Sequence, residues 1–150
     1  MKVAPYIPSA PEAIRKMLEI GEARPNDTLY DLGCGDGRIL IVAVKEFGVK
    51  KAVGIEIRRD LVRKALENVK KMNLADRISI IWGDFFYVDI SPATIVTLYL
   101  SYTGNVKLKE KLKRELKKGT RVVSHDFEIP GWSPIKEAVV GLHNIYLYVI

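Results

Sequence analysis

A glycine-rich segment, Gly33-Cys34-Gly35-Asp36-Gly37, directly follows the short apolar stretch 28–32. Glycine adopts left-handed backbone conformations at little cost, so glycines at three alternate positions permit a sharp turn. The nearly continuous apolar run 39–44 comes next and predicts a buried helix. A strand, a glycine loop and a helix N-terminus together suit a polar or anionic ligand, because the first helical N–H groups lack partners.

Strand-like and helix-like apolar patterns alternate along the rest of the chain. Such alternation predicts βαβ units, and right-handed crossovers place helices on both faces of a mostly parallel sheet. We therefore expect a doubly wound α/β, Rossmann-like fold in one domain over 1–150, in which 1–27 form an N-terminal flap and helix. The expected strands are 28–32, 51–57, 78–82, 95–100, 120–125 and 144–150. Two helices are expected to end near Ile20 and Phe47, and two more to span 60–72 and 105–116, the last of them stopped by Gly119. A helical turn is expected within 134–141.

The composition predicts a globular protein, with 48% hydrophobic and 28% charged residues. A single cysteine excludes an internal disulfide, and no apolar run approaches the length of a membrane span or a signal peptide, so we expect a cytoplasmic location. The net charge of +6 leaves two interpretations. It indicates either an acidic partner such as RNA, DNA or a protein surface, or the interleaved Lys and Glu of a heat-adapted protein.

The spacing of the glycines argues against a nicotinamide dinucleotide. The fingerprint G-x-G-x-x-G would place its third glycine at position 38, which is Arg38. Asp31 precedes the loop by two residues, and a carboxylate there can pair with a ligand's ammonium group. S-adenosylmethionine carries an ammonium group and no pyrophosphate, so it explains Asp31 better. The expected cofactor site therefore includes Asp31 and four loop residues, in which Cys34 is a small residue that fits the turn: Gly33, Cys34, Gly35 and Gly37.

Two further acids follow or close predicted strands. Glu56, near the end of the second strand, can accept hydrogen bonds from both ribose hydroxyls. Asp84, after the third strand, can accept from an adenine amino group, with Ile57 and Phe85 or Phe86 flanking the ring. Each acid alone also fits a helix N-cap or a surface carboxylate. The ordered set of acids and glycines favours S-adenosylmethionine.

The glycine loop and the three acids resemble those of class I, seven-strand methyltransferases. Further segments are similar to the small archaeal broad-specificity protein lysine methyltransferases and their mitochondrial lysine methyltransferase relatives, and the similarity runs from Pro5 to Ile150. The segments are Pro5-Tyr6-Ile7-Pro8-Ser9, Tyr30–Arg38, Val88–Pro92, Thr97–Leu100 and Arg121–Phe127. This resemblance implies a minimal class I methyltransferase fold, S-adenosylmethionine as cofactor and lysine side chains of proteins as methyl acceptors.

The segment 97–101 bears on the acceptor, because it lacks the Asn/Asp-Pro-Pro-aromatic sequence of methylases that act on adenine, cytosine or glutamine. A deprotonated lysine amine is already a good nucleophile, so orientation and a neutral amine suffice. We expect Tyr99 to line a lysine channel, Asp126 or His125 to serve as any general base, and Tyr6 to cover the cofactor. Alternatively, His125 and Tyr99 are ordinary core side chains, and Tyr6 staples the first helix to the sheet.

No metal site is expected, because two histidines, His125 and His143, and one cysteine lack the spacing of a metal motif. The lysine-rich segment 107–118 is either a solvated helix face or a docking surface for acidic protein or RNA. The leading hypothesis is a monomeric protein-lysine N-methyltransferase with loose selectivity for exposed lysines. An RNA or small-molecule methyltransferase and a non-catalytic cofactor-binding protein are the alternatives.

Overall fold

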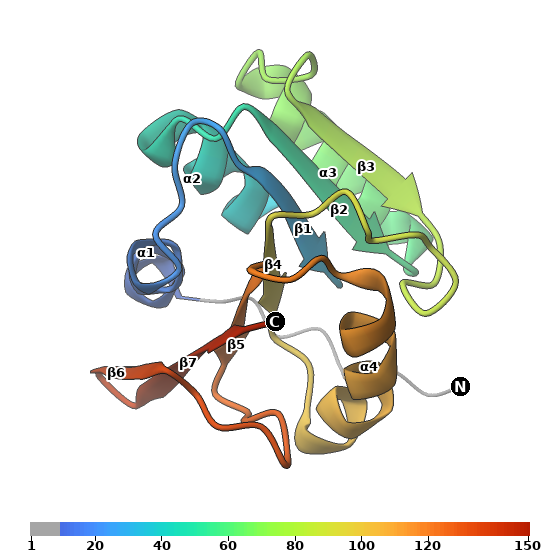
Figure 1. The fold of residues 1–150 in the computed structure, drawn as a ribbon. Coiled ribbons are helices and arrows are strands. Elements are labelled where there is room, and N and C mark those ends of the chain that lie inside the picture. Colours follow the sequence, from blue (N-terminus) through green and yellow to red (C-terminus); the bar gives the residue numbers. More distant parts are fainter. Residues whose placement is uncertain (1–9) are drawn as a thin grey trace.

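The computed structural model describes residues 10–150, so Tyr6 and the predicted flap lie outside the described residues. Seven strands form one sheet in the order β3-β2-β1-β4-β5-β7-β6 (Figure 1). The first five strands are parallel to their neighbours, whereas β7 runs antiparallel to β5 and β6 antiparallel to β7. The elements are α1 (Pro11–Ile20), β1 (Thr28–Leu32), α2 (Arg38–Phe47), β2 (Lys51–Glu56), α3 (Arg59–Lys71), β3 (Ile78–Trp82), β4 (Ile95–Leu98), α4 (Tyr102–Glu115), β5 (Arg121–His125), β6 (Lys136–Val140) and β7 (His143–Val149).

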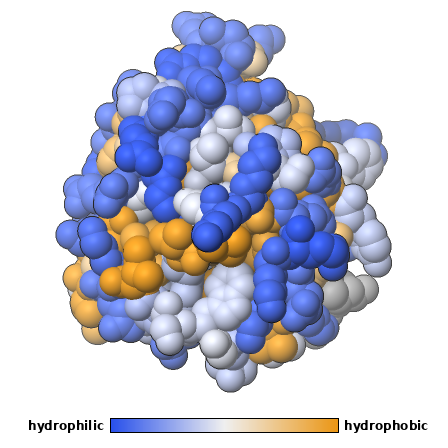
Figure 2. Space-filling model, viewed as in Figure 1, coloured by the Kyte–Doolittle hydropathy of each residue, from blue (hydrophilic) through white to orange (hydrophobic). Residues whose placement is uncertain are grey.

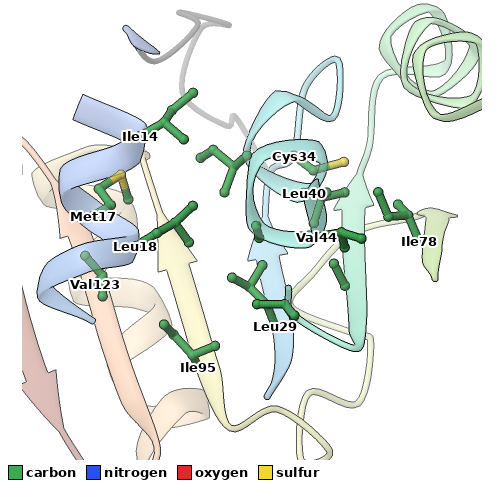
Figure 3. Packing of buried hydrophobic residues seen from close by; sticks show 14 of the residues in the cluster. Ile14, Met17, Leu18, Leu29, Cys34, Leu40, Val44, Ile78, Ile95 and Val123 are labelled. Atoms are coloured by element: carbon green, nitrogen blue, oxygen red, sulfur yellow. The ribbon is translucent and has the colours of Figure 1, made fainter. Parts of the chain in front are cut away.

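Helices cover both faces of the sheet, as predicted. On one face α1 and α2 pack over strand residues such as Leu29, Ile95 and Val123 (Figure 3), and α3 packs on β2 and β3. On the other face α4 packs through Leu108 and Leu112, together with the loops that follow β3 and β5. Burial of these apolar side chains supplies the main driving force for folding, at roughly 25 cal/mol per Å². The predicted doubly wound, mostly parallel fold is confirmed.

The C-terminal ends of the parallel strands meet at one edge of the sheet, where open α/β sheets bind their ligands. Asp31 near the end of β1 pairs in register with Gly54 on β2 and Thr97 on β4. Strands β2 and β3 continue the same edge on one side, and β4 and β5 on the other. The sheet therefore brings the predicted cofactor acids and the predicted acceptor residues to one edge.

The segment 134–141 is a strand, so the predicted helical turn is wrong. Residues Lys136–Val140 form β6, which pairs along its length with β7. Gly141, in a left-handed conformation with φ +60°, lies in the turn that joins the two strands. The hairpin provides backbone partners for the β-branched Val139 and Val140, which favour strands over helices.

The fourth helix also differs from the prediction at both ends. It begins at Tyr102 rather than Asn105, because the Ser101 hydroxyl caps it by accepting from the Gly104 N–H at 2.9 Å. It ends at Glu115, and Gly119 lies beyond it in the turn before β5, donating to the Ile150 carbonyl at 2.8 Å. The predicted role of Gly119 as the helix stop is therefore wrong.

The lysine-rich surface of α4 is less open than its sequence suggests. Lys111 is buried and pairs with Glu115 at 2.6 Å, and Arg114 also pairs with Glu115, at 3.4 Å. Lys109 donates to the Pro130 carbonyl at 2.7 Å. Hydrophilic residues cover most of the face in Figure 2, with an apolar band at the level of the C-terminus. No helix within 10–150 is both long and apolar enough to cross a membrane.

Candidate functional site

The glycine loop makes a tight turn that other residues would resist. Gly33, Gly35 and Gly37 have φ angles of +83°, +56° and +85°, in the left-handed region. The N–H groups of Gly33 and Cys34 both donate to the Ile55 carbonyl, at 2.8 and 3.0 Å, which ties the loop to the end of β2. Gly37 is the N-cap of α2. The loop therefore joins β1 to a helix N-terminus, as the sequence predicts.

Cys34 points away from the loop surface and into the core, beside Leu40 (Figure 3). Gly54 leaves room for it, because a Cβ at that position would lie 2.5 Å from the Cys34 sulfur and 2.6 Å from Leu40 Cδ1. Burial raises the pKa of the thiol, so the sulfur is not a nucleophile. Cys34 thus fills the turn as predicted.

Asp31 is almost fully buried, with 2% of its surface exposed. The Thr97 hydroxyl donates to Asp31 Oδ1 at 2.8 Å. Burial raises the pKa of the Asp31 carboxyl to about 7, the Thr97 hydrogen bond opposes this shift, and the carboxylates of Glu56 and Asp36 add to it. A cationic ligand group would relieve this cost, because an adjacent positive charge favours the ionised carboxylate.

Glu56 is buried at the end of β2 and holds the glycine loop in place. Its Oε1 accepts from the Gly35 N–H at 2.8 Å, and its Oε2 accepts from the Arg58 N–H at 2.9 Å. Each carboxylate oxygen has a second lone pair, so both can accept a further hydrogen bond. Glu56 therefore holds the glycine loop in place and can also accept hydrogen bonds from two hydroxyl groups of a ligand.

Asp84 and Phe85 follow β3 at the same edge. The Gly83 N–H donates to the Glu56 carbonyl at 3.0 Å, and Asp84 Oδ1 accepts from the Phe86 N–H at 2.9 Å. The Phe85 ring is buried, and its edge lies 3.9 Å from where a Cβ of Gly33 would be. Ile57, after β2, is 41% exposed. Asp84 itself is half-buried.

The predicted acceptor residues also come together, at the ends of β4 and β5. The Tyr99 and His125 rings are in contact at an interplanar angle of 30°, with centroids 3.9 Å apart. Asp126 has a left-handed backbone with φ +65°, and its Oδ2 lies 3.6 Å from His125 Nε2. His143, at the start of β7, completes the cluster, since its Nδ1 lies 2.9 Å from His125 Nε2.

Burial sets the protonation of this cluster. It lowers the pKa of the fully buried His125 to about 4; the Asp126 charge opposes the shift and His143 adds to it. The pKa of Tyr99 is raised by its burial and by the charge and hydrogen bond of Asp126. At neutral pH, His125 is therefore a neutral imidazole and Tyr99 a neutral phenol.

Comparison with known proteins assigns the family. The profile of the ANTKMT methyltransferase domain matches residues 31–136. A protein-lysine N-methyltransferase of Saccharolobus islandicus is 53% identical over 97% of this chain and 93% of its own length. The chain belongs to the ANTKMT methyltransferase family. The adenine nucleotide translocase lysine N-methyltransferase of Mus musculus is 28% identical over 96% of the chain, which spans 62% of that relative.

Solved structures show the same methyltransferase fold. The structure of an RNA methyltransferase from Salinibacter ruber, in complex with S-adenosyl-L-homocysteine, has a TM-score of 0.94 and 43% identity, covering 96% of this chain and 94% of that one. A tRNA methyltransferase of B. subtilis has a TM-score of 0.80 at 17% identity and shows the fold alone; the match covers 93% of this chain and 65% of that one.

The residues of this family member fit S-adenosylmethionine by the chemistry of their donor set. The buried Asp31 carboxylate suits an ammonium group, and the free lone pairs of Glu56 suit a ribose diol. Any side chain at Gly33 would point toward Leu100 and Phe85, so glycine keeps this surface open to a ligand. The predicted cofactor residues within 10–150 thus line one continuous edge.

Sequence reasoning missed three residues of this edge. Thr97 was recognised as part of a motif and not as the donor to Asp31, a pairing that follows once β1 and β4 are neighbours. His143 was considered only as a metal ligand, because the sequence does not show that the β6–β7 hairpin returns it to His125. Asn105 on α4 donates to the Phe127 and Glu128 carbonyls at 3.0 Å, and its Oδ1 is buried with no partner among the described residues.

Proposed function

We propose that this chain transfers the methyl group of S-adenosylmethionine to the side-chain amine of lysine in proteins. The observation that carries the proposal is the 53% identity, over nearly the full length of both chains, to an archaeal protein-lysine N-methyltransferase. The mitochondrial relatives, which are also lysine N-methyltransferases, support the same acceptor. The site adds a chemical argument: its acceptor side offers a phenol, an imidazole and a carboxylate.

Each of the three acids would bind a different part of the cofactor. Asp31 would pair with the ammonium group, Glu56 would accept from the ribose hydroxyls, and Asp84 would accept from the adenine amino group beside Phe85. When bound, the cofactor supplies an electrophilic methyl group on a sulfonium. Ionised Asp31 is stabilised by the ammonium group, because the opposite charge offsets its burial. The Thr97 hydroxyl fixes the carboxylate in the orientation needed for that contact.

The acceptor side must deliver a neutral amine. A free lysine amine has a pKa of about 10.4, so at neutral pH it must lose a proton before it attacks. We propose that the Asp126 carboxylate attracts the lysine ammonium and receives its proton at Oδ2, while the Tyr99 ring lines the aliphatic part of the side chain. The neutral, buried His125 holds Tyr99 by a close, tilted ring contact. Desolvation next to these rings favours the neutral amine.

Loose substrate selectivity is part of the proposal. Exposed apolar and aromatic side chains follow β4 and β5: Tyr102 and Val106 on α4, and Phe127 after β5, are 59%, 47% and 36% exposed. Such side chains suit the aliphatic stem of lysine and specify no neighbouring sequence. We therefore expect lysines in flexible, exposed segments to be preferred.

An RNA acceptor is the second candidate, because the Salinibacter ruber structure at 43% identity is named as an RNA methyltransferase. The net charge of +6 agrees with it. Two observations on α4 weaken it. Lys111 is buried in an ion pair, and Lys109 is partly buried and donates to a backbone carbonyl, so these two cations are less accessible to phosphates than the sequence suggests.

A pair of peptides tests the acceptor. One peptide carries a single lysine in a flexible Gly/Ser sequence, and the matched control carries arginine instead. We expect methyl transfer, followed by mass spectrometry, to the lysine peptide alone. Asp126→Asn should lower kcat and leave cofactor affinity unchanged, with the exposed Asp89→Asn as the matched control. Methylation of a short RNA but of neither peptide would overturn the proposal.

A further inference from the structure

Three side-chain atoms converge at the end of β5 and the start of β7. His125 Nε2 lies 2.9 Å from His143 Nδ1 and 3.6 Å from Asp126 Oδ2, and the last two atoms are 3.3 Å apart. From these distances, the circle that passes through the three atoms has a radius of about 1.9 Å. Three ligand atoms of a tetrahedral zinc site, each about 2.05 Å from the ion, lie on a circle of the same radius. One ion could therefore lie at a normal bond length from all three atoms.

Hydrogen bonding accounts for these contacts less well than a cation does. If His125 Nε2 carries the proton between the imidazoles, His143 Nδ1 presents its lone pair to the Asp126 carboxylate at 3.3 Å. If His143 Nδ1 carries the proton, this single N–H must donate to both His125 Nε2 and Asp126 Oδ2. A single proton leaves one of the contacts unsatisfied or shared, whereas a metal ion attracts all three atoms.

The backbone holds the carboxylate toward the imidazoles. Asp126 has a left-handed conformation, which is uncommon for a residue other than glycine, and its N–H donates to the Asn144 carbonyl at 2.7 Å. The Asn144 N–H in turn donates to Asp126 Oδ1 at 3.0 Å, which leaves Oδ2 for the cluster. Such outer hydrogen bonds orient ligands in metal sites. His125 is buried, while the side chain of His143 is 34% exposed and opens the site to solvent.

We propose that His125, Asp126 and His143 form a binding site for a divalent transition-metal ion, with zinc as the occupant. Two imidazole nitrogens and one carboxylate oxygen suit zinc, whereas magnesium and calcium favour oxygen ligands alone. This proposal departs from the expectation of no metal site, which rested on sequence spacing and did not include the antiparallel return of β7. An ion at this site would occupy Asp126 Oδ2. Zinc should therefore inhibit methyl transfer, a consequence that rests on the proposed function, whereas binding itself does not.

The two histidines of the site are the only ones in the chain, so metal binding can be assigned cleanly. The full chain, made without a histidine tag and stripped with a chelator, is titrated with Co²⁺ in the visible range and with Zn²⁺ by calorimetry. We expect one equivalent to bind. His143→Ala and Asp126→Asn should each weaken zinc binding at least about 100-fold, since even outer partners contribute about 10–100-fold. Asp89→Asn is the matched control and should bind like the wild type.

Cofactor affinity, measured on the same samples, shows whether the variants are folded. Zinc binding of equal strength in the wild type and His143→Ala, or no binding by the folded wild type, would overturn the site. The two proposals fail separately: one equivalent of zinc without methylation of the lysine peptide would reject the proposed function and keep the metal site. Methylation of the lysine peptide without zinc binding would keep the proposed function and reject the metal site.

Discussion

Replacement of Asp31 by asparagine should make the protein more stable and its cofactor binding weaker. Burial raises the pKa of this carboxyl from 3.8 to about 7, so in the absence of a ligand the folded state binds the proton more tightly than the unfolded state. Ionised Asp31 therefore destabilises the fold. The penalty is absent below pH 3.8, grows as the pH rises to about 7 and is complete above it.

The size of the effect follows from the shift. At 1.36 kcal/mol per pKa unit, the full penalty is about 4 kcal/mol. Asparagine has the same shape and can still accept from the Thr97 hydroxyl, but it carries no charge. Asp31→Asn should therefore raise the free energy of unfolding by up to about 4 kcal/mol at pH 8 and by little near pH 4.

Urea denaturation at pH 4.5, 6 and 8 without added cofactor measures the difference between the two proteins, and calorimetry with S-adenosylmethionine measures binding. The exposed Asp76→Asn removes one negative charge from the surface and serves as the matched control. We expect the variant's stability advantage to grow with pH and its cofactor affinity to fall at least tenfold. A stability difference that is constant with pH, or a variant less stable at pH 8, would refute the reasoning about Asp31.

Three further substitutions test the packing and the cofactor site. Gly54→Ala should lower the free energy of unfolding by about 1–3 kcal/mol, since its methyl group would overlap Cys34, and unchanged urea unfolding would contradict this packing. Arg121→Met leaves the buried Asp27 carboxylate without its ion-pair partner and should lower the free energy of unfolding by about 3–5 kcal/mol in the same assay. A decrease below about 1 kcal/mol would show that the ion pair is not essential for stability. Glu56→Gln places an amide N–H donor opposite a backbone N–H that now donates to a carboxylate oxygen. It should weaken S-adenosylmethionine binding about tenfold, as measured by calorimetry, and an unchanged affinity would contradict this role of Glu56.

The cofactor edge was predictable because its signals are local. Three alternate glycines require left-handed backbone, and all three adopt it. Asp31, Glu56 and Asp84 each stand at or just after the end of an apolar run, and the parallel sheet brings such ends together. The sequence could not show that Asp31 is buried deeply enough to shift its pKa, because that depends on packing from three neighbouring elements.

The acceptor cluster was only partly predictable because it depends on a long-range return of the chain. His125 and Asp126 follow from the end of β5, but His143 reaches them through the hairpin of β6 and β7, which lies at the sheet edge. The short segment 135–140, with Pro134 before it and Gly141 after it, fits either a helical turn or a strand. Pairing with β7 decides between them, and local sequence does not contain that pairing.

The central claim is tested most directly by the identity of the methylated product. The purified chain is incubated with methyl-labelled S-adenosylmethionine and with total cell protein or total RNA in separate reactions, and the labelled material is hydrolysed to single units. The account predicts label in the protein fraction, recovered as methyl-lysine and lost with Asp31→Asn. Label in RNA alone would contradict it and would make the exposed cations of α4 the candidate RNA-binding face.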